Sequence, residues 1–366
     1  MSMSAIRVAQ VVGCMNGGGV ESVVMNYYRH IDRTRVQFDF LVNADSTQIP
    51  RREIEGLGGR VYEIPPYSRL FEYRDELTRL FRSSRWEIVH SHVNSLSVLP
   101  LSIAKRSGVP VRIAHSHSTS GKGEILKNIV KRVLRTQSNR YPTHRFACSN
   151  DAGEWLFGKS HDYEVIANAI DLERFKFDEG ARAALRGDLG IGEDAVVVGH
   201  VGRFMLQKNH AFLIDMFEQY HQVNDNSYLV LVGTGSLMNE IRETVSERSL
   251  NDCVVFLGQK EDVERMYSAF DVFCLPSLYE GLGVVAIEAQ AAGCRCLLST
   301  EVPHEADVTN QCAFLPINDP CVWAEAVADL MQNERNKVDW RDFSAYEIGS
   351  ASEKLADRYE AMLGKA

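Results

Sequence analysis

Residues 276–293 read Pro-Ser-Leu-Tyr-Glu-Gly-Leu-Gly-Val-Val-Ala-Ile-Glu-Ala-Gln-Ala-Ala-Gly, and two carboxylates, Glu280 and Glu288, flank a pair of glycines in this stretch. The residues before it, 271–276, form an apolar run that ends in proline and predicts a buried strand. Residues 284–292 are rich in Ala, Ile, Glu and Gln, which favours a helix that ends at Gly293. The predicted order is therefore strand, glycine loop and helix.

This order points unpaired backbone N–H groups and the positive end of the helix dipole at whatever lies in front of the loop. Such a helix start suits an anion, and a phosphate above all. Glu280 is expected in the loop and Glu288 about one turn into the helix, where carboxylates can accept hydrogen bonds from sugar hydroxyls. The stretch therefore predicts a site for a ligand that carries both groups, such as a nucleotide sugar.

The first half of the chain alternates short apolar runs with helical segments, which is typical of a parallel sheet covered by helices on both faces. The expected strands are residues 7–13, 38–42, 60–64, 88–91, 111–115 and 145–149. The expected helices between them include residues 20–29, 73–83 and 96–107.

The same alternation starts again after a join near residues 165–175 and a charged stretch without strand signals that runs to Asp194. The expected strands of this half are residues 196–201, 228–232, 254–257, 272–275, 294–299 and 313–316. We therefore predict an α/β protein with two doubly wound parallel-sheet domains that face each other across a cleft. The first domain spans residues 1–168 and the second 169–345, and a C-terminal helix in 346–366 crosses back to the first domain.

Length and composition indicate a globular protein of two domains, because single cores stop growing near ~250–300 residues. Residues 1–168 carry 23 Lys and Arg against 16 Asp and Glu, whereas residues 169–366 carry 17 against 33. This split indicates either different partners for the two halves or their mutual attraction. We expect a cytoplasmic protein with eight reduced cysteines, since neither a membrane-length apolar run nor a signal-peptide layout is found.

Three adjacent glycines, Gly17, Gly18 and Gly19, follow the first expected strand and open the first expected helix. They allow a ligand to approach the backbone closely, which predicts a loop for a phosphate or for the acceptor. The alternative is an ordinary flexible turn. The glycine spacing differs from the dinucleotide-binding pattern Gly-x-Gly-x-x-Gly, and no acidic residue suited to a ribose follows about 20 residues later.

A basic pair, Arg203 and Lys208, follows the first strand of the second half, with Gly202 before it and Asn209 after it. Ligands of open α/β sheets bind at the carboxyl ends of the strands, where these side chains are expected. A guanidinium and an ammonium together can hold a diphosphate and neutralise it as it leaves. The alternative for each residue is solvated surface.

Two His-x-His pairs end neighbouring strands of the first half, His90 with His92 and His115 with His117. In an extended segment both rings of such a pair point to the same face. We expect His115 or His117 near the reacting sugar, and we expect no metal site and no cofactor. In the same direction, the chain has no Asp-x-Asp pair to hold Mg²⁺ against phosphates and no P-loop.

Two weaker features concern the base of a nucleotide and a membrane surface. The loop from Gly258 to Val263 could present backbone groups to a nucleobase, or be plain surface. The stretch from Lys122 to Arg145 holds seven Lys and Arg and one acid, with apolar residues at helical spacing. It predicts either peripheral contact with an anionic membrane or a helix packed on its own domain. An acidic pI near 5.7 argues against nucleic acid as a partner.

With these motifs the chain resembles the family-4 retaining glycosyltransferases of the GT-B fold, which have two Rossmann-like domains, and especially bacterial enzymes of exopolysaccharide, capsule or lipopolysaccharide synthesis. The resemblance covers nearly the whole chain. Its most specific parts are Gly202-Arg203-x-x-x-x-Lys208-Asn209 and the run from Glu280-Gly281-x-Gly283 through Glu288 to Gly293. Leu282 and Gln290 replace the commoner Phe and Met of the family, which we expect to tune packing.

The resemblance implies a role for each matched position. Arg203 and Lys208 would bind the donor diphosphate, Glu280 the hydroxyls of the transferred sugar, and Glu288 the ribose. Backbone groups would close over the phosphates from both domains. The full set of expected donor-binding residues is Gly17, Gly18, Gly19, Gly202, Asn209, Gly258, Val263, Gly281, Leu282, Gly283, Val284 and Glu288, and the expected catalytic residues are Glu280, Arg203, Lys208, His115 and His117.

The function that follows is transfer of a hexose, with retention and without a metal, from a nucleotide diphosphate to a saccharide or lipid-linked saccharide. UDP is the favoured nucleotide and GDP the rival. The alternatives are another nucleotide-sugar enzyme of this fold, such as an epimerase or a sucrose-synthase-like enzyme, and a catalytically silent binding subunit. Intact Arg203, Lys208, Glu280 and Glu288 argue against a silent subunit.

Overall fold

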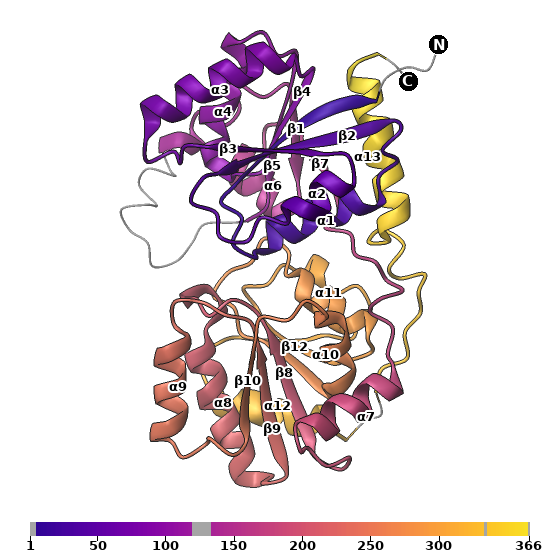
Figure 1. Ribbon diagram of the computed structural model, residues 1–366. Coiled ribbons are helices and arrows are strands. Elements are labelled where there is room, and N and C mark those ends of the chain that lie inside the picture. Colours follow the sequence, from indigo (N-terminus) through magenta and orange to yellow (C-terminus); the bar gives the residue numbers. More distant parts are fainter. Residues whose placement is uncertain (1–4, 119–132, 333–334, 365–366) are drawn as a thin grey trace. The chain divides into compact units, whose positions relative to one another are not determined.

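A computed structural model describes residues 5–118, 133–332 and 335–364 (Figure 1). These residues form two compact units. The first unit contains residues 5–118, 133–170 and 345–364, and the second contains residues 171–332 and 335–344. Each unit is a parallel sheet with its own helices, so the chain is an α/β protein with two parallel-sheet domains, as the sequence predicted.

The first unit has seven parallel strands in the order β3-β2-β1-β4-β5-β6-β7. Their bounds are β1 Ile6–Gly13, β2 Val36–Asn43, β3 Arg60–Ile64, β4 Ile88–Ser91, β5 Val111–Ser116, β6 His144–Ala147 and β7 Glu164–Val165. The described α-helices are α1 Gly19–His30, α2 Arg51–Gly56, α3 Leu70–Ser84, α4 Val98–Arg106, α6 Asn150–Phe157 and α13 Ile348–Met362. Six of the seven strands lie where the apolar runs predicted them, and the two-residue β7 was missed.

The two faces of this sheet bury two separate apolar clusters, because successive side chains of a strand point to opposite faces. Val8 of β1 and Phe40 of β2 belong to the cluster that α1 and α13 cover. Their neighbours Ala9 and Leu41 belong to the cluster beneath α3, α4 and α6. Burial on both faces is why these strands appear in the sequence as nearly continuous apolar runs.

The C-terminal helix α13 belongs to the first unit, although more than 170 residues separate it from the rest of that unit along the chain. Its Leu355 and Tyr359 are buried in the cluster that also contains residues of α1 (Figure 1). At its exposed side, Arg35 pairs with Asp357 at 2.7 Å. A parallel bridge joins Ile170 to Glu347 where the chain returns.

The second unit has six parallel strands in the order β10-β9-β8-β11-β12-β13. Their bounds are β8 Val196–Val201, β9 Ser227–Val232, β10 Val254–Gly258, β11 Val272–Leu275, β12 Arg295–Ser299 and β13 Ala313–Leu315. The described α-helices are α7 Glu179–Asp188, α8 His210–Val223, α9 Met238–Glu247, α10 Val263–Ala269, α11 Val284–Ala291 and α12 Pro320–Leu330. The charged stretch before Asp194, in which we expected no strand, contains α7.

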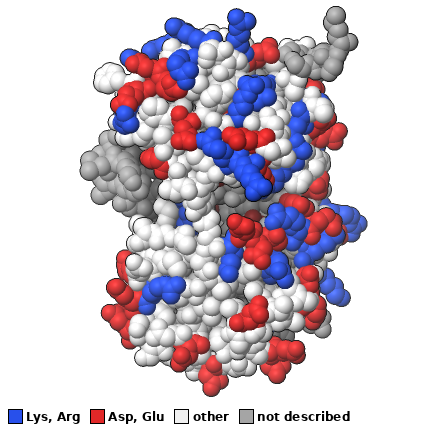
Figure 2. Space-filling view, viewed as in Figure 1, with Lys and Arg blue, Asp and Glu red and all other residues white. Residues whose placement is uncertain are grey.

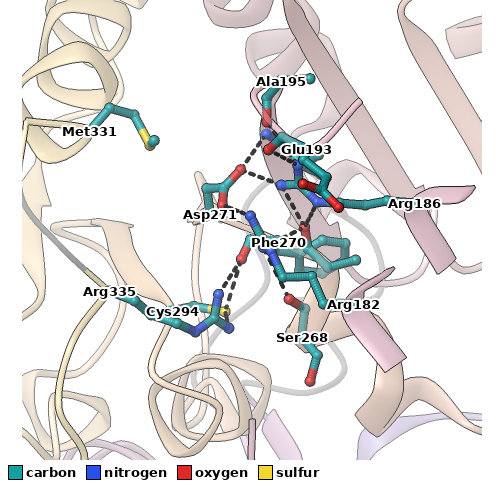
Figure 3. Close-up of polar contacts among 12 residues, drawn as sticks. Arg182, Arg186, Glu193, Ala195, Ser268, Phe270, Asp271, Cys294, Met331 and Arg335 are labelled. Atoms are coloured by element: carbon teal, nitrogen blue, oxygen red, sulfur yellow. Dashed lines mark hydrogen bonds and ion pairs between the residues drawn. The ribbon is translucent and has the colours of Figure 1, made fainter. Parts of the chain in front are cut away.

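One buried carboxylate, Asp271, ties α7 to the amino ends of β8 and β11 (Figure 3). It accepts hydrogen bonds from Arg182 at 2.6 Å, from Arg186 at 2.5 Å and from the backbone N–H of Val197 at 2.8 Å. Arg186 is 3% exposed and also donates to the carbonyl oxygens of residues 192, 193, 195 and 269. Each charge in the cluster is therefore paired and hydrogen-bonded, which offsets the cost of burying it.

The described residues bear on three further expectations, which concern the charge distribution, the cysteines and the lack of a membrane span. Side chains of both signs lie next to one another on the displayed face of the first unit (Figure 2). One ion pair of this unit joins Arg29 to Glu53 at 2.6 Å. All eight cysteines are free thiols, and five are buried. Among the described residues, the helices are all too short or too polar to cross a membrane.

Four of the seven basic residues in the stretch that suggested membrane contact, Lys122, Lys127, Lys131 and Arg132, lie outside the described residues. The described part has partners within the first unit. Arg135 lies over the ring of Trp155 at 5.3 Å, and Arg145 of β6 donates to Asn139 at 2.7 Å. The membrane hypothesis therefore depends on the residues that are not described.

We predict that Asp271→Ala lowers the free energy of unfolding of the second unit by about 3–5 kcal/mol, because it leaves two arginines without their buried partner. Urea unfolding followed by circular dichroism measures the change. Asp339→Ala is the matched control, since Asp339 pairs with Arg341 in the same unit but at an exposed site. An Asp271 variant as stable as this control would contradict the role given to the cluster.

Candidate active site

The strand order of the second unit reverses beside its first strand, β8, whose neighbours are β9 and β11. The loops that follow β8 and β11 leave the same edge of the sheet and run to opposite sides. In open α/β sheets ligands bind at this edge, beside the strands where the order reverses. Residues 202–209 follow β8 and residues 276–283 follow β11, so the two motifs that the sequence singled out meet at this position.

Lys208 and Glu280 form an ion pair at this edge, with Nζ and Oε1 2.7 Å apart. Ser277 Oγ donates to the same carboxylate oxygen at 2.7 Å, and Gln207 Nε2 donates to the other at 3.2 Å. Glu280 is only 7% exposed, so these donors compensate for the water that it has lost. The structure thus brings together two predicted catalytic residues that are 72 positions apart.

The loop after β8 packs so tightly against the loop after β9 that the glycine positions at their contact have no room for a side chain. A Cβ atom on Gly233, whose φ is +136°, would lie 2.1 Å from the carbonyl oxygen of Gly202, and one on Gly235 would lie 2.4 Å from that of Phe204. A Cβ on Gly202 would lie 3.2 Å from the chain of Lys208. These glycines therefore fix the path of the loop that carries Lys208.

Arg203 and Asn209 occupy the same loop in different ways. Arg203 is exposed and its guanidinium forms no hydrogen bond or ion pair within the described part of the chain, so this group is available to a ligand. Asn209 has a φ of 54° at the start of α8, a left-handed conformation that Asn tolerates better than most residues. The loop therefore offers one free cation beside one paired cation.

Helix α11 starts at this edge, as the sequence predicted. Gly283 precedes it with a φ of +87°, and a Cβ atom there would also lie 3.2 Å from Val302. Gly281 lies in the same turn, Leu282 is buried, and Val284 opens the helix. The first turn of α11 therefore presents its backbone N–H groups at the edge where Lys208 and Glu280 lie.

Gln290 forms five hydrogen bonds, four of which hold the loop after β12 against α11. Its Nε2 donates to the carbonyl oxygens of Ala286 and Ala306, at 2.9 and 2.6 Å. Its Oε1 accepts from the backbone N–H of Val308 and from the N–H and hydroxyl of Thr309. The residue that replaces the family's usual Met therefore does more than tune packing, because it satisfies backbone groups that a thioether could not.

Glu288 lies about one turn into α11 and accepts a hydrogen bond from the hydroxyl of Tyr267 at 2.6 Å. Burial raises the pKa of Glu288 from its ordinary value to about 7, and the charge of Glu264 acts in the same direction. The hydrogen bond from Tyr267 and the charges of Lys208 and Arg174 act to lower this pKa. The carboxyl group therefore changes its charge near neutral pH. No sequence pattern pointed to Tyr267 as its partner.

The remaining predicted donor residues of this unit are placed at the same edge of the sheet. Gly258 ends β10 with a φ of +68°, and its carbonyl oxygen accepts from Gly233 N–H at 2.8 Å. Val263 opens α10, the helix that carries Tyr267. Gly258 is thus bonded to the loop that packs against Gly202, while Val263 shares a helix with the partner of Glu288.

In the first unit, Gly17, Gly18 and Gly19 link β1 to α1. Gly17 has a φ of +75°, which favours glycine. Gly18 is buried, and its N–H donates to Glu21 Oε2 at 2.8 Å, which closes the start of α1. A Cβ on Gly19 would meet nothing within 4 Å among the described atoms. The loop therefore needs glycine at position 17, while the space beside Gly19 is open.

His90, His92, His115 and His117 gather at the carboxyl ends of β4 and β5, and each is at most 7% exposed. The ring nitrogens of His90, His92 and His115 lie within 4.8 Å of one another, a spacing that could hold a metal ion. Those of His90 and His92 are, however, all engaged in hydrogen bonds with side chains. All four ring nitrogens of His90 and His92 are thus used within the protein. Among the described residues, the cluster contains no carboxylate ligand.

Comparisons with known proteins agree with this architecture in both halves of the chain. The family described as Glycosyl transferases group 1 matches residues 181–345, and the Glycosyl transferase 4-like domain matches residues 18–169. A protein of Bacillus subtilis (strain 168) that carries the name glycosyltransferase EpsF is 37% identical over 363 residues, which cover 95% of this chain and 94% of that protein.

Two further relatives are more distant. The UDP-Gal:alpha-D-GlcNAc-diphosphoundecaprenol alpha-1,3-galactosyltransferase of Escherichia coli is 27% identical over 312 residues, 78% of each chain. The crystal structure of HepE from Anabaena, in complex with UDP and glucose, superposes with a TM-score of 0.76 at 18% identity and covers 96% of this chain and 95% of that one. This likeness shows a shared GT-B fold.

The chain therefore belongs to the glycosyltransferases of the GT-B fold, and it is a hexosyltransferase.

We predict that Gln290→Met lowers the free energy of unfolding by about 1–3 kcal/mol, because buried backbone groups at Ala306, Val308 and Thr309 lose their partner. Differential scanning calorimetry should show a lower melting temperature. Gln332→Met is the matched control, since Gln332 is exposed and has a single long contact with Asp329, at 3.4 Å. Equal melting temperatures for the two variants would show that the five hydrogen bonds contribute nothing.

Proposed function

We propose that this chain transfers a sugar from a nucleotide diphosphate donor to a saccharide or lipid-linked saccharide in the synthesis of a cell-surface polysaccharide, with retention of configuration. The observation that carries the proposal is the Lys208–Glu280 pair at the edge of the sheet where α11 begins. Cation, carboxylate and helix N-terminus lie together there, as a ligand with a diphosphate and a sugar requires.

In this proposal the second unit binds the donor. The free guanidinium of Arg203 and the ammonium of Lys208 bind the diphosphate and neutralise the negative charge that grows on it as the bond to the sugar breaks. The N–H groups at the start of α11 bind the same phosphates. Glu280, held by Ser277 and Gln207, keeps acceptor atoms for the sugar hydroxyls when Lys208 turns to the phosphate.

The acceptor is deprotonated on the face of the sugar from which the diphosphate leaves, and the departing phosphate oxygen takes its proton. The new bond therefore forms on the side of the old one, and the configuration is retained. Arg203 and Lys208 supply the positive charge that this step needs, so we expect transfer without a metal ion. His115 and His117 of the first unit act at the reacting sugar.

UDP is the donor nucleotide that we favour, and two relatives support this choice. The Escherichia coli relative is named for transfer from UDP-Gal to a diphosphoundecaprenol-linked sugar, and the structure of HepE contains UDP and glucose. A lipid-linked acceptor would also require contact with the inner face of the membrane, to which the basic stretch starting at Lys122 would contribute. We accordingly propose a cytoplasmic protein at that surface.

We predict that Lys208→Ala and Glu280→Gln each lower the rate of sugar transfer by about 10²-fold or more, because each removes a charge contact with the transition state. The rate is followed as release of nucleoside diphosphate. Lys176→Ala is the matched control, since Lys176 pairs with Glu173 at an exposed site of the same unit. Normal transfer by folded Lys208 and Glu280 variants would refute the assignment.

We also predict that donor affinity rises with pH up to about 7, because the ribose hydroxyls donate to ionised Glu288, whereas its carboxyl group is neutral in the free protein at lower pH. The raised pKa stabilises the free fold below pH 4.5 and this contribution is lost as the pH rises through 7. Donor binding at pH 6 should therefore release a proton, with affinity changing about tenfold per pH unit.

Calorimetry with UDP-glucose at pH 6, in two buffers of different ionisation enthalpy, measures this release. UDP-glucose is suitable because its diphosphate does not titrate in this range. Glu288→Gln should bind with no proton release and with little dependence on pH. The same release from the variant would assign the proton to another group and would remove Glu288 from the ribose site.

A further inference from the structure

The four histidines at the ends of β4 and β5 form two hydrogen-bonded chains that start from one side chain, Gln10 of β1. Gln10 lies beside His90 in the register of β1 and β4. Its amide contacts His92 Nε2 through Oε1, at 2.8 Å, and Tyr359 Oη through Nε2, at 3.3 Å. Tyr359 is a fully buried residue of the C-terminal helix α13.

The first chain runs from Gln10 through His92 to His117. Because Gln10 Oε1 can only accept, His92 Nε2 carries the proton and donates it. The pKa values of His92 and His117 are lowered by burial, so both rings are neutral and each has one N–H. His92 Nδ1 therefore accepts from His117 Nε2 at 2.9 Å. The chain ends at His117 Nδ1, which must be a bare acceptor.

The second chain runs from Gln10 through Tyr359 and His90 to His115. Tyr359 Oη accepts from Gln10 and donates to His90 Nδ1 at 2.7 Å. Burial also lowers the pKa values of His90 and His115, so these rings are neutral as well. His90 Nε2 then donates to His115 Nδ1 at 3.1 Å. This chain ends at His115 Nε2, which must be an N–H donor.

Both terminal nitrogens are buried and have no hydrogen-bond partner among the described residues. The two rings that carry them lie side by side, with centroids 3.9 Å apart and planes tilted by 31°. The backbone at this point is also fixed, because His117 N–H donates to Asn94 Oδ1 at 2.7 Å. A buried donor and a buried acceptor without partners are costly, which points to a ligand that supplies both.

The complementary character of the two ends does not depend on how the Gln10 amide is turned. Exchanging its oxygen and nitrogen reverses every hydrogen bond in both chains at once. His117 Nδ1 then becomes the donor and His115 Nε2 the acceptor. One amide at the root therefore guarantees one donor and one acceptor at the ends.

We propose that Gln10 and Tyr359 are positioning residues that set the tautomers of His115 and His117, so that this pair binds a hydroxyl group of the saccharide substrate as donor and acceptor together. A hydroxyl group accepts one hydrogen bond and donates another, which matches the two ends. The substrate class rests on the proposed function. The tautomers themselves rest only on the contacts within the first unit.

A small cavity lies beside the cluster. It has a volume of about 20 Å³ and is lined by Gln10, His90, His92, His115 and Tyr359 together with apolar residues of α1 and α13. Its walls are almost entirely apolar, and it is large enough for one water molecule at most. His117 does not line this cavity, so water in it would leave His117 Nδ1 open to a ligand.

The test is a long-range ¹H–¹⁵N correlation spectrum of the histidine side chains, in which protonated and bare ring nitrogens resonate far apart. In the wild-type protein without ligand, His90, His92, His115 and His117 should all be neutral and all four should be protonated at the same nitrogen, which is Nε2 for the Gln10 amide as described and Nδ1 for the amide turned round. If any of the four carries its proton on a different nitrogen from the others, the two chains are not joined at Gln10 and the proposal fails.

The variant Tyr359→Phe removes the hydroxyl group that links Gln10 to His90 in the second chain. His90 and His115 should then lose their single tautomer, since nothing contacts His90 Nδ1, and kcat/KM for transfer should fall about tenfold, as for the loss of one ordered hydrogen bond. Tyr27→Phe is the matched control, because Tyr27 is also buried and donates to the carbonyl oxygen of Ala167 at 2.7 Å, outside both hydrogen-bonded chains. It should change neither tautomers nor transfer.

Binding of UDP alone separates this proposal from the proposed function. UDP should bind wild type and Tyr359→Phe equally, because the cations proposed to bind its phosphates, Arg203 and Lys208, lie in the second unit and Tyr359 lies outside the donor-binding residues. Failure of the wild type to bind any nucleotide would refute the proposed function and leave the tautomer result intact. A Tyr359→Phe protein with unchanged His115 tautomer or unchanged kcat/KM would overturn the positioning role.

Discussion

The reversal of strand order beside the first strand of each parallel sheet is the constraint on which the rest of the structure depends. In the second unit it places β11 next to β8, although the chain has built β9 and β10 in between. The loops after these two strands therefore start side by side. The 2.7 Å contact between Lys208 and Glu280 is a consequence of that order. In the first unit β4 lies next to β1 for the same reason, which places Gln10 beside His90.

The charged groups at these edges are arranged before any ligand binds. Glu280 is buried but has three donors, and burial raises the pKa of Glu288 to about 7 although the hydrogen bond from Tyr267 lowers it. Arg203 is free among the described residues. A diphosphate and a ribose would thus find one cation ready, one that can leave its partner, and one carboxyl group that gains charge as the ligand arrives. Such preorganisation lowers the cost of binding and of charge development.

The sequence predicted the local structure well, because periodicity and glycine placement are local signals. β3, β4, β8 and β11 have the bounds that the apolar runs gave them, and α11 starts at the predicted residue. The same signals singled out Lys208, Glu280 and the two His-x-His pairs. They could not show that Lys208 pairs with Glu280, since charge complementarity alone does not select one partner among many.

Sequence reasoning mainly missed the contacts between residues that lie far apart in the chain, and the reasons are again physical. Tyr359 is 349 residues from Gln10, and it contacts the histidines only because α13 returns to the first unit. Tyr267 and Asp271 looked like ordinary residues of an apolar stretch. Four of the five hydrogen bonds of Gln290 depend on a loop whose path no local pattern encodes. Burial of a polar side chain is thus the signal that sequence reasoning lacks.

The central claim, that the carboxyl edge of the second sheet binds a nucleotide sugar, is tested most directly by hydrogen–deuterium exchange with mass spectrometry. Exchange would be compared with and without UDP- and GDP-sugars. If the donor binds at this edge, one of these nucleotide sugars should slow exchange in residues 202–209 and 279–288. Exchange in the strands and helices at the opposite edge should be unchanged. Protection elsewhere, or none from any donor at concentrations that saturate related enzymes, would contradict it.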